Sequence, residues 1–184
     1  MEESVIAMNE KETQREKRAQ GKMVLSPWAR CTKRTLDVVA SIVGMIVFSP
    51  LILIVYLAVR MEDGGDAIFS QTRVGYRGKD FTLYKFRSMV VSHNGSSVSV
   101  AGDSRITPFG TKLRHYKIDE LPELWDVLVG NMSFVGPRPD VPGYADKLEG
   151  DNRDVLKLRP GITGPATLKY RLEDEMISEY VEKK

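Results

Sequence analysis

The feature that most constrains this chain is an uncharged apolar run of 22 residues, Val38–Val59, which lies between Asp37 and Arg60. A helix of about 20 apolar residues is long enough to cross the hydrocarbon core of a bilayer. The dipeptide Ser49-Pro50 divides the run into halves of 12 and 10 residues. Because proline lacks a backbone N–H and clashes with the preceding helical turn, the run predicts a membrane helix that is broken at this dipeptide.

Both flanks of the run are rich in basic side chains. Residues 11–34 carry eight Lys or Arg and two Glu, a net charge of +6, and residues 60–87 carry six Lys or Arg against four Asp or Glu. Basic flanks favour the cytoplasmic side of a membrane and attract anionic headgroups. Since both flanks favour the same compartment, residues 33–60 are predicted to form a re-entrant hairpin. The hydroxyls of Ser49 or Ser41 would assist the carbonyls near Pro50.

Other interpretations of the N-terminal half stay open at this point. Residues 11–34 are also consistent with a solvated disordered tail, and the apolar run with a buried hairpin of a soluble protein, since both halves are apolar on all sides. A cleaved signal peptide fits poorly, because the run is too long for its apolar region and no small-residue cleavage site follows.

The rest of the chain predicts a compact α/β unit that is mixed and helix-rich, with a small β-hairpin. Residues 67–74 and 81–86 are strand-like and are joined by a loop at 75–80. Residues 107–116 and 122–129 have helical patterns, and the second helix is expected to end near Gly130. Residues 91–104 are expected to form a loop, the proline- and glycine-rich segments after residue 135 to form ordered loops, and the last fifteen residues to form a polar helix.

Composition excludes several classes of protein. One cysteine, Cys31, and two histidines leave no internal disulfide and no cysteine-based zinc site, so a bound metal would be one that prefers oxygen ligands. The net charge of +2 falls to −1 for residues 36–184, which argues against nucleic-acid binding. The sequence contains no P-loop, no H-E-x-x-H and no G-x-S-x-G motif.

The candidate chemistry is concentrated in residues 114–127. Asp119 and Glu120 come just before Pro122 at a predicted helix entrance, and Arg114 and Lys117 are close in sequence. Mg²⁺ prefers one or two carboxylates together with phosphate oxygens, and a carboxylate can attack phosphorus. The alternative is that acidic residues at a helix N-terminus only complement the helix dipole.

Five arginines lie in or beside turn-forming or structured segments, where their planar guanidinium groups suit phosphate oxygens. They are Arg87, Arg114, Arg138, Arg159 and Arg171. Several such arginines, together with glycine-rich loops whose amides can face an anion, point to a diphosphate substrate.

A series of motifs in one order resembles a known family. The motifs are KRTLD (33–37), the Ser49-Pro50 apolar run, FTLYKFRSM (81–89), IDELPELWDVLVGNMSFVGPRP (118–139) and RPGITGPA (159–166). Over residues 30–175 the chain resembles the bacterial sugar transferases that are monotopic phosphoglycosyl transferases, in their short form. The resemblance implies a basic tail and interfacial segment (1–32), a re-entrant membrane helix (33–60) and a cytosolic, membrane-associated catalytic domain (61–184).

The resemblance also implies an activity and roles for residues. The family moves a sugar phosphate from a UDP-sugar to a polyprenyl phosphate, usually undecaprenyl phosphate, and releases UMP as an early membrane step of polysaccharide biosynthesis. By this likeness Asp119 is the nucleophile that forms a covalent phosphosugar, and Glu120 ligates Mg²⁺. Residues expected to bind phosphates or the nucleotide are Lys85, Arg87, Arg114, Arg138 and, as a weaker match, Arg171; Arg159 is placed with them, with orientation of its own loop as the alternative.

The expected partners are the UDP-sugar, the polyprenyl phosphate and membrane lipids at the cytosolic face of the bacterial inner membrane, with a second copy or glycosyltransferases as further candidates. Trp28 is expected near the interface, and Trp125 is expected either there or in the core beside Leu124. Two other functions are kept as alternatives: a membrane-anchored Mg²⁺-dependent nucleotide-sugar phosphohydrolase, and a non-enzymatic scaffold of a glycan assembly complex.

Overall fold

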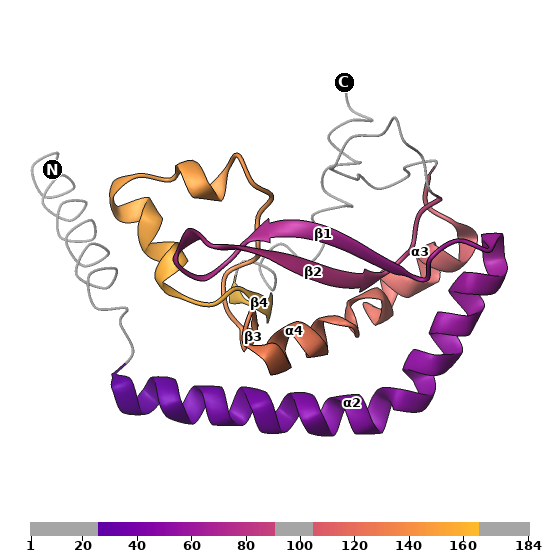
Figure 1. Cartoon of the computed structure of the whole chain (residues 1–184), viewed down its shortest axis with the longest axis horizontal. Coiled ribbons are helices and arrows are strands. Elements are labelled where there is room, and N and C mark those ends of the chain that lie inside the picture. Colours follow the sequence, from indigo (N-terminus) through magenta and orange to yellow (C-terminus); the bar gives the residue numbers. More distant parts are fainter. Residues whose placement is uncertain (1–25, 91–104, 166–184) are drawn as a thin grey trace, which may run out of the picture. The chain divides into compact units, whose positions relative to one another are not determined.

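The computed structural model describes residues 26–90 and 105–165. They belong to two compact units, one that ends at Arg34 and one that begins at Thr35. Figure 1 shows the elements and labels the α-helices and strands; the 3-10 helices are denoted η in the text. In chain order they are α2 (Pro27–Asp63), β1 (Ile68–Val74), η1 (Tyr76–Gly78), β2 (Asp80–Phe86), α3 (Pro108–His115), η2 (Ile118–Glu120), α4 (Glu123–Val129), β3 (Ser133–Val135), η3 (Ala145–Lys147), η4 (Gly150–Lys157) and β4 (Gly161–Thr163).

Helix α2 is one continuous helix that contains Pro50. Figure 1 shows its axis bending between a longer N-terminal part and a shorter C-terminal part. A proline in a helix leaves the carbonyl four residues earlier without its donor, which bends the helix. Here the hydroxyl of Ser49 donates to that carbonyl, the one of Ile46, at 2.8 Å. Residues 33–60 therefore lie in one bent helix and not in two separate helices.

Of the two serines expected to assist the bend, Ser49 is confirmed and Ser41 is wrong. The Ser41 hydroxyl donates to the carbonyl of Asp37 at 2.8 Å, one turn back along the helix and far in sequence from Pro50. A serine hydroxyl within a regular helix turn reaches its own preceding carbonyls most readily, and this local bond takes precedence over a more distant one.

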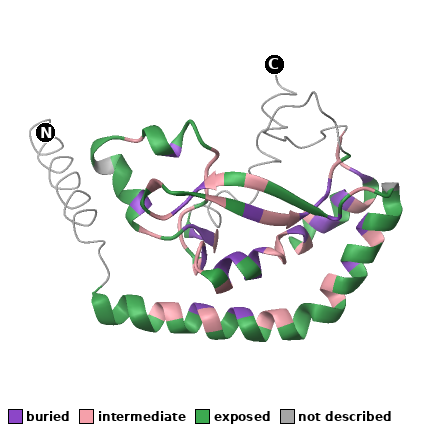
Figure 2. Cartoon of the chain, in the orientation of Figure 1, coloured by how far each residue is buried: buried purple, intermediate pink, exposed green. Residues whose placement is uncertain are grey.

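Most of the α2 surface is apolar and exposed. Within the part of the chain that the structure describes, α2 is the one helix long and apolar enough to cross a membrane, and only 11% of its most apolar window is buried. Figure 2 shows exposed residues along most of this helix. The large apolar side chains exposed here include those of Leu36, Val39, Val43, Ile46, Val47, Leu53, Ile54 and Leu57. A helix whose apolar side chains face outward needs a further apolar environment to cover them.

A narrower face of α2 packs against the rest of the chain. In its C-terminal part Val55 and Val59 form a core with Phe86 of β2 and Leu113 of α3. In its N-terminal part the buried Asp37 accepts hydrogen bonds from the Ser133 hydroxyl at 2.8 Å and from the Phe134 N–H at 3.2 Å. Both parts of the bent helix therefore contact the α/β unit.

The strands β1 and β2 pair antiparallel as the predicted hairpin, and Gln71 lies opposite Leu83 in its register. The tight connection contains Arg77 and Gly78, both with positive φ. Side chains directly opposite each other in such a pair share one face of the hairpin. Phe81 and Leu83 of that face pack with Val127 of α4, so Gln71, Arg73 and Lys85 are directed to the same side.

Helices α3 and α4 confirm the two helical predictions within a residue or two at each end. Thr107 caps α3 by accepting the N–H of Gly110 at 2.8 Å. Gly110 has no space for a side chain, because a Cβ would lie 2.1 Å from the carbonyl oxygen of Ser88. Helix α4 follows Pro122 and ends at Gly130, which has φ of 95°. A left-handed glycine is the common way to terminate a helix.

The structure contains a second small sheet that the sequence does not predict: β4 lies in a segment expected to be a loop, and β3 comes directly before another such segment. Strands β3 and β4 pair parallel, with Ser133 opposite Gly161 and Val135 opposite Thr163. Two glycines make this approach possible, because a Cβ on Gly136 would lie 2.2 Å from the Arg159 carbonyl oxygen and one on Gly161 would lie 2.1 Å from the Gly136 nitrogen. Three-residue strands leave too short a pattern in sequence to be recognised.

The exposure of Trp125 excludes one of the two positions expected for it. Its side chain is 52% exposed, so packing in the core is wrong, whereas its neighbour Leu124 is buried. The described part of the chain is α/β and helix-rich, with one long apolar helix near its N-terminus. The predictions for residues 1–25, 91–104 and 166–184, including Arg171, lie outside the described residues.

Candidate active site

The centre of the site is a lysine held between two carboxylates. Lys85 of β2 lies with its Nζ 3.1 Å from Glu120 Oε1 and 3.0 Å from Glu123 Oε1. Glu120 ends the 3-10 helix η2 and Glu123 begins α4, so the two carboxylates are one helical turn apart. We call Asp119, Glu120, Glu123 and Lys85 the carboxylate cluster.

Asp119 is the carboxylate of this cluster that lacks a partner. Asp119 is 8% exposed, and its Oδ1 is buried without a hydrogen bond to any described residue. Burial raises the pKa of Asp119 above its ordinary value; Lys85 opposes this, Glu120 adds to it, and Lys117 and Arg114 oppose it. A buried polar atom without a partner is costly, and in a native site it marks a group kept for a ligand or for chemistry.

The charges of Glu123 and Lys85 depend on one another. Burial raises the pKa of Glu123 to about 7, although Lys85 acts against this shift. Burial by itself lowers the pKa of Lys85, but Glu123 and Glu120 outweigh it and hold that pKa above the ordinary value. The lysine is therefore a fixed positive charge in a largely buried position.

The backbone before Asp119 is strained. Lys117 adopts φ of 57°, in the left-handed region that non-glycine residues avoid. This residue turns the chain from α3 into η2, and so directs Asp119 and Glu120 toward Lys85. Strain of this kind persists where the surrounding structure requires it, and it is concentrated at functional sites.

Two of the predicted arginines, Arg87 and Arg114, are held by different parts of the structure. Arg114 donates from Nε to the Ser88 hydroxyl at 2.8 Å, and its charge also acts on Asp119. Arg87 is buried and donates to the Val59 carbonyl of α2 at 3.4 Å. Gly65 leaves room for it, since a Cβ there would lie 2.1 Å from Arg87 Nη1. Arg114 thus belongs with the carboxylate cluster, whereas Arg87 holds the C-terminal part of α2.

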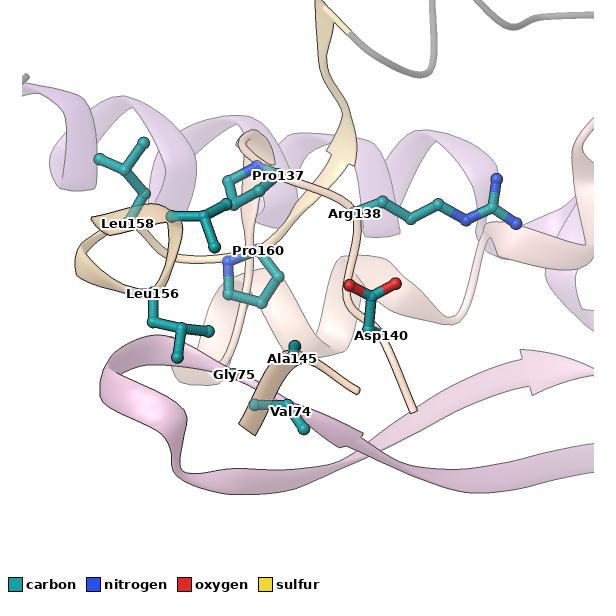
Figure 3. A pocket seen from close by; sticks show the side chains of 10 residues that line it. Val74, Gly75, Pro137, Arg138, Asp140, Ala145, Leu156, Leu158 and Pro160 are labelled. Atoms are coloured by element: carbon teal, nitrogen blue, oxygen red, sulfur yellow. The ribbon is translucent and has the colours of Figure 1, made fainter. Parts of the chain in front are cut away.

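Arg138 and Arg159 lie on the proline- and glycine-rich segments. Arg138 is exposed on the loop after β3 and lines a pocket together with Leu156 and Leu158, and Figure 3 shows its side chain extending away from these two apolar residues. Arg159 donates from Nε to the Gly130 carbonyl at 2.9 Å and lies 5.4 Å from the centre of the Tyr76 ring. Arg159 therefore joins the end of α4 to the hairpin connection.

Sequence reasoning missed Glu123 and Arg73. The sequence places Glu123 in a helix but gives no function for its side chain. Its position three residues after Glu120 allows both carboxylates to contact Lys85. Arg73 was assigned to a strand, where its side chain donates to the Pro139 carbonyl. The spacing of Glu120 and Glu123 is a readable signal in sequence, whereas the contact of Arg73, between residues 66 positions apart, is not.

Comparison with known proteins places the chain in a family. Residues 28–183 match the model of the family described as bacterial sugar transferase, and the chain belongs to this family.

Several curated relatives are similar over the same region. A UDP-N-acetylgalactosamine-undecaprenyl-phosphate N-acetylgalactosaminephosphotransferase of Aeromonas hydrophila is 36% identical over 82% of this chain and 37% of its own length. A UDP-glucose:undecaprenyl-phosphate glucose-1-phosphate transferase of Caulobacter vibrioides is 42% identical over 74% of this chain and 53% of its own length. An undecaprenyl-phosphate galactose phosphotransferase of Salmonella typhimurium is 39% identical over 74% and 32%. The chain thus spans about a third to a half of the length of these relatives.

Proposed function

We propose that this protein transfers a sugar-1-phosphate from a UDP-sugar to a polyprenyl phosphate such as undecaprenyl phosphate and releases UMP. The observation that carries the proposal is the buried, unpartnered Oδ1 of Asp119 in a cluster with Lys85 and Glu120. The names of the three relatives, which all refer to undecaprenyl phosphate and to transfer of a sugar phosphate, support this substrate class.

In the first step, an Asp119 carboxylate oxygen attacks the β-phosphorus of the UDP-sugar. A bond forms between that oxygen and phosphorus, the bond from the β-phosphorus to the bridging oxygen breaks, and UMP leaves with the electron pair. In the second step, a phosphate oxygen of the polyprenyl phosphate attacks the same phosphorus. The acyl phosphate bond breaks, the carboxylate is restored and the product is a polyprenyl diphosphate sugar.

The surroundings of Asp119 suit this role. Burial keeps water away from the carboxylate, and its raised pKa makes the ionised form a better nucleophile than an ordinary, solvated aspartate. Lys85 and Arg114 supply positive charge near the position where the diphosphate would lie. Fixed charges of this kind stabilise the transition state of phosphoryl transfer without reorganisation.

The residues present fit Mg²⁺ bound together with substrate. Among the described residues no three acidic, His or Cys side chains form a group that would hold a metal ion. Mg²⁺ needs only one or two carboxylates when phosphate oxygens and water complete its shell, and Glu120, with a side chain 22% exposed, presents one beside Asp119. Glu120 would hold the ion, which would neutralise the diphosphate and stabilise the departing UMP.

We further propose that α2 enters the membrane from the cytosolic side and returns to it, because the helix is bent at Pro50 and exposes apolar side chains. A lipid phosphate lies at headgroup level and a UDP-sugar is soluble, so the site must lie at the interface. Trp125, which is half exposed on α4, is an aromatic side chain of the type that prefers this depth.

The reaction is tested by the mass of the intact protein. Incubation of detergent-solubilised protein with Mg²⁺ and a panel of UDP-sugars, without lipid acceptor, is expected to add one sugar-phosphate mass, and Asp119→Asn is expected to add none. Adding undecaprenyl phosphate should then remove the adduct as lipid product. Release of free sugar phosphate in the absence of the lipid would indicate a phosphohydrolase, and neither adduct nor UMP release with any donor would contradict the proposed function.

The membrane topology is tested separately with cysteine labelling. Cys31 is the only cysteine of the sequence and is exposed, which makes it a natural reporter for the start of α2. Lys79→Cys in a Cys31→Ser background reports on the exposed hairpin connection. In spheroplasts, a membrane-impermeant maleimide should label neither position, and both should react after lysis. Labelling of only one of the two in intact spheroplasts would show that α2 spans the membrane.

A further inference from the structure

The loop that carries Arg138 is held on both sides of this residue. We call residues 136–140 the arginine loop. The Pro137 carbonyl accepts the Gly161 N–H of β4 at 2.8 Å, and the Pro139 carbonyl accepts a hydrogen bond from Arg73 Nη1 at 3.2 Å. Proline fixes its own φ. Because the carbonyls of Pro137 and Pro139 are also hydrogen-bonded, the peptide units on both sides of Arg138 have little freedom to rotate. One of these two anchors is main chain, and the other is a single side chain.

The anchoring side chain is itself fixed. Arg73 donates from Nη2 to Gln71 Oε1 at 2.6 Å, and the two residues lie on the same face of β1. The N–H of the next residue, Val74, donates to the Asp140 carbonyl at 2.9 Å, which ties the end of the arginine loop to the same strand. A planar guanidinium can donate to two acceptors in a fixed geometry, which a lysine ammonium does not reproduce.

Arg73 and Arg138 also interact through charge. Burial, followed by the positive charge of Arg138, lowers the pKa of Arg73, while Asp140 and Glu123 raise it. Arg73 nevertheless keeps its positive charge, because arginine does not lose its proton in proteins. The Arg73 Nε is buried and has no hydrogen-bond partner among the described residues. Two like charges held together are relieved by an anion, and phosphate suits the guanidinium geometry.

From these contacts we infer that Arg73 is a positioning residue for Arg138, and that it holds the Arg138 guanidinium where it binds a phosphate of the nucleotide donor. This inference rests on the proposed function. Figure 3 shows the Arg138 side chain, which lines the same pocket, extending from the loop on a different side from Leu156, Leu158 and Pro160, so the anchor at Pro139 sets the direction in which this side chain leaves the loop.

A double-mutant cycle tests the inference. The kcat and the donor KM are measured for the wild type, Arg73→Gln, Arg138→Gln and the double variant, with the UDP-sugar that gives the adduct. We expect Arg73→Gln to raise KM about tenfold or more with little change in kcat, and to change KM less than about twofold once Arg138 is already replaced. Lys79→Gln removes a positive charge from the exposed hairpin connection and should leave both constants unchanged.

Two further variants separate positioning from charge and from folding. Arg73→Lys keeps the charge but loses the two-acceptor geometry, so it should behave as Arg73→Gln does. Gln71→Leu removes the acceptor that fixes the Arg73 guanidinium but keeps the hydrogen bond of Arg73 to the Pro139 carbonyl, so it should raise the donor KM by a smaller factor. Backbone amide hydrogen exchange of residues 136–140 should also be faster in this variant than in the wild type.

Three outcomes would overturn the inference while the proposed function stands, given a wild type that transfers sugar phosphate. They are equal effects of Arg73→Gln in both backgrounds, normal kinetics in Arg73→Lys, and normal kinetics together with unchanged hydrogen exchange in Gln71→Leu. A wild type that neither forms the adduct nor releases UMP would remove the proposed function, and the inference would fail with it.

Discussion

Two regions of the α/β unit hold charged side chains in place by different means. In the carboxylate cluster, Glu123 is buried, and Lys85 is fixed by ionic contacts of 3.0 Å with Glu123 and 3.1 Å with Glu120. In the arginine loop, the side chain of Arg138 is exposed and the main chain on both sides of it is held by hydrogen bonds. The first region is organised by electrostatics and the second by backbone geometry.

The two regions are therefore expected to contribute differently to the reaction. Buried charges that are fixed before substrate arrives act most strongly on the charge that develops during reaction. An exposed arginine on a fixed loop contributes mainly to binding, since its charge is screened by solvent and salt. Changes in the carboxylate cluster are therefore expected to lower kcat, and changes around the arginine loop to raise KM or to reduce stability.

The largest effect is expected from Lys85→Met. This variant removes the charge that Glu120 and Glu123 share, and we expect kcat to fall by about 10²–10³ with a smaller change in donor KM. The protein should remain folded, because the pKa of Glu123 is about 7 already and its carboxyl can take up a proton when the lysine is gone. Steady-state UMP release measures the effect.

The matched control for this variant is Lys79→Met, which removes an exposed lysine from the same hairpin. It should keep wild-type kcat. A Lys85→Met enzyme that loses affinity for the donor but keeps kcat would show that the carboxylate cluster works by binding, and the contrast between the two regions would fail.

A pH series on Glu123→Gln tests how far burial governs the carboxylate cluster. The folded protein holds the pKa of Glu123 at about 7, against 4.5 ordinarily, so the folded state binds this proton more tightly than the unfolded state does. Below pH 4.5 both states are protonated and no penalty exists. As pH rises from 4.5 to 7 the free energy of unfolding falls, and above 7 the full loss is about 3 kcal/mol.

Glu123→Gln lacks this titration. Denaturant unfolding in detergent at pH 5 and pH 8, without Mg²⁺, should show that the wild type loses about 2–3 kcal/mol more than the variant does between the two values, because part of the full penalty is already present at pH 5. Asp126, whose pKa burial also raises, is present in both proteins and cancels in the difference. Parallel losses in the two proteins would mean that Glu123 is not buried as an ionisable group.

The sequence predicted much of the fold and part of this site. The hairpin and helices α3 and α4 have clear patterns and terminators such as Thr107 and Gly130, and the structure places them where these signals indicate. Asp119 and Glu120 are adjacent in sequence, so their proximity could be read without the fold. The family resemblance implied that Lys85 binds phosphate or the nucleotide, but it did not imply the ion pairs of Lys85 with Glu120 and Glu123. Local signals and shared motifs were sufficient for all of these features except the ion pairs.

Contacts between distant segments were not predictable in the same way. The bond of Arg73 to Pro139 joins β1 to a loop that follows two helices, and the buried Asp37 bonds to Ser133 and Phe134 from the other end of the chain. The parallel pairing of β3 and β4 depends on the close approach of the backbone at Gly136 and Gly161, which no sequence periodicity predicts. Such features follow only from tertiary packing.

Gly136→Ala tests whether the arginine loop is held by its main chain. A Cβ at this position would lie 2.2 Å from the Arg159 carbonyl oxygen and 2.8 Å from the Gly161 nitrogen, and neither backbone atom can move without parting β3 from β4. We expect a loss of about 2 kcal/mol in the free energy of unfolding and a higher donor KM. Val135→Ala, at the exposed last residue of β3 directly before Gly136, is the control and should change stability far less. A Gly136→Ala protein with wild-type stability would show that the loop adapts.

The smallest effect is expected from Arg159→Met, which removes the hydrogen bond to the Gly130 carbonyl and the contact with Tyr76 while keeping an unbranched side chain. The bond lies at an exposed position, so we expect a loss of about 1 kcal/mol in the free energy of unfolding and a change in donor KM smaller than that of Arg138→Gln. Arg159→Lys keeps the charge without the Nε donor, so it distinguishes support of the fold from attraction of phosphate. Equal loss of stability in both variants, with the donor KM unchanged, would support a structural role. A donor KM that is raised in Arg159→Met and normal in Arg159→Lys would instead place Arg159 among the phosphate-binding side chains, together with Arg138 of the arginine loop.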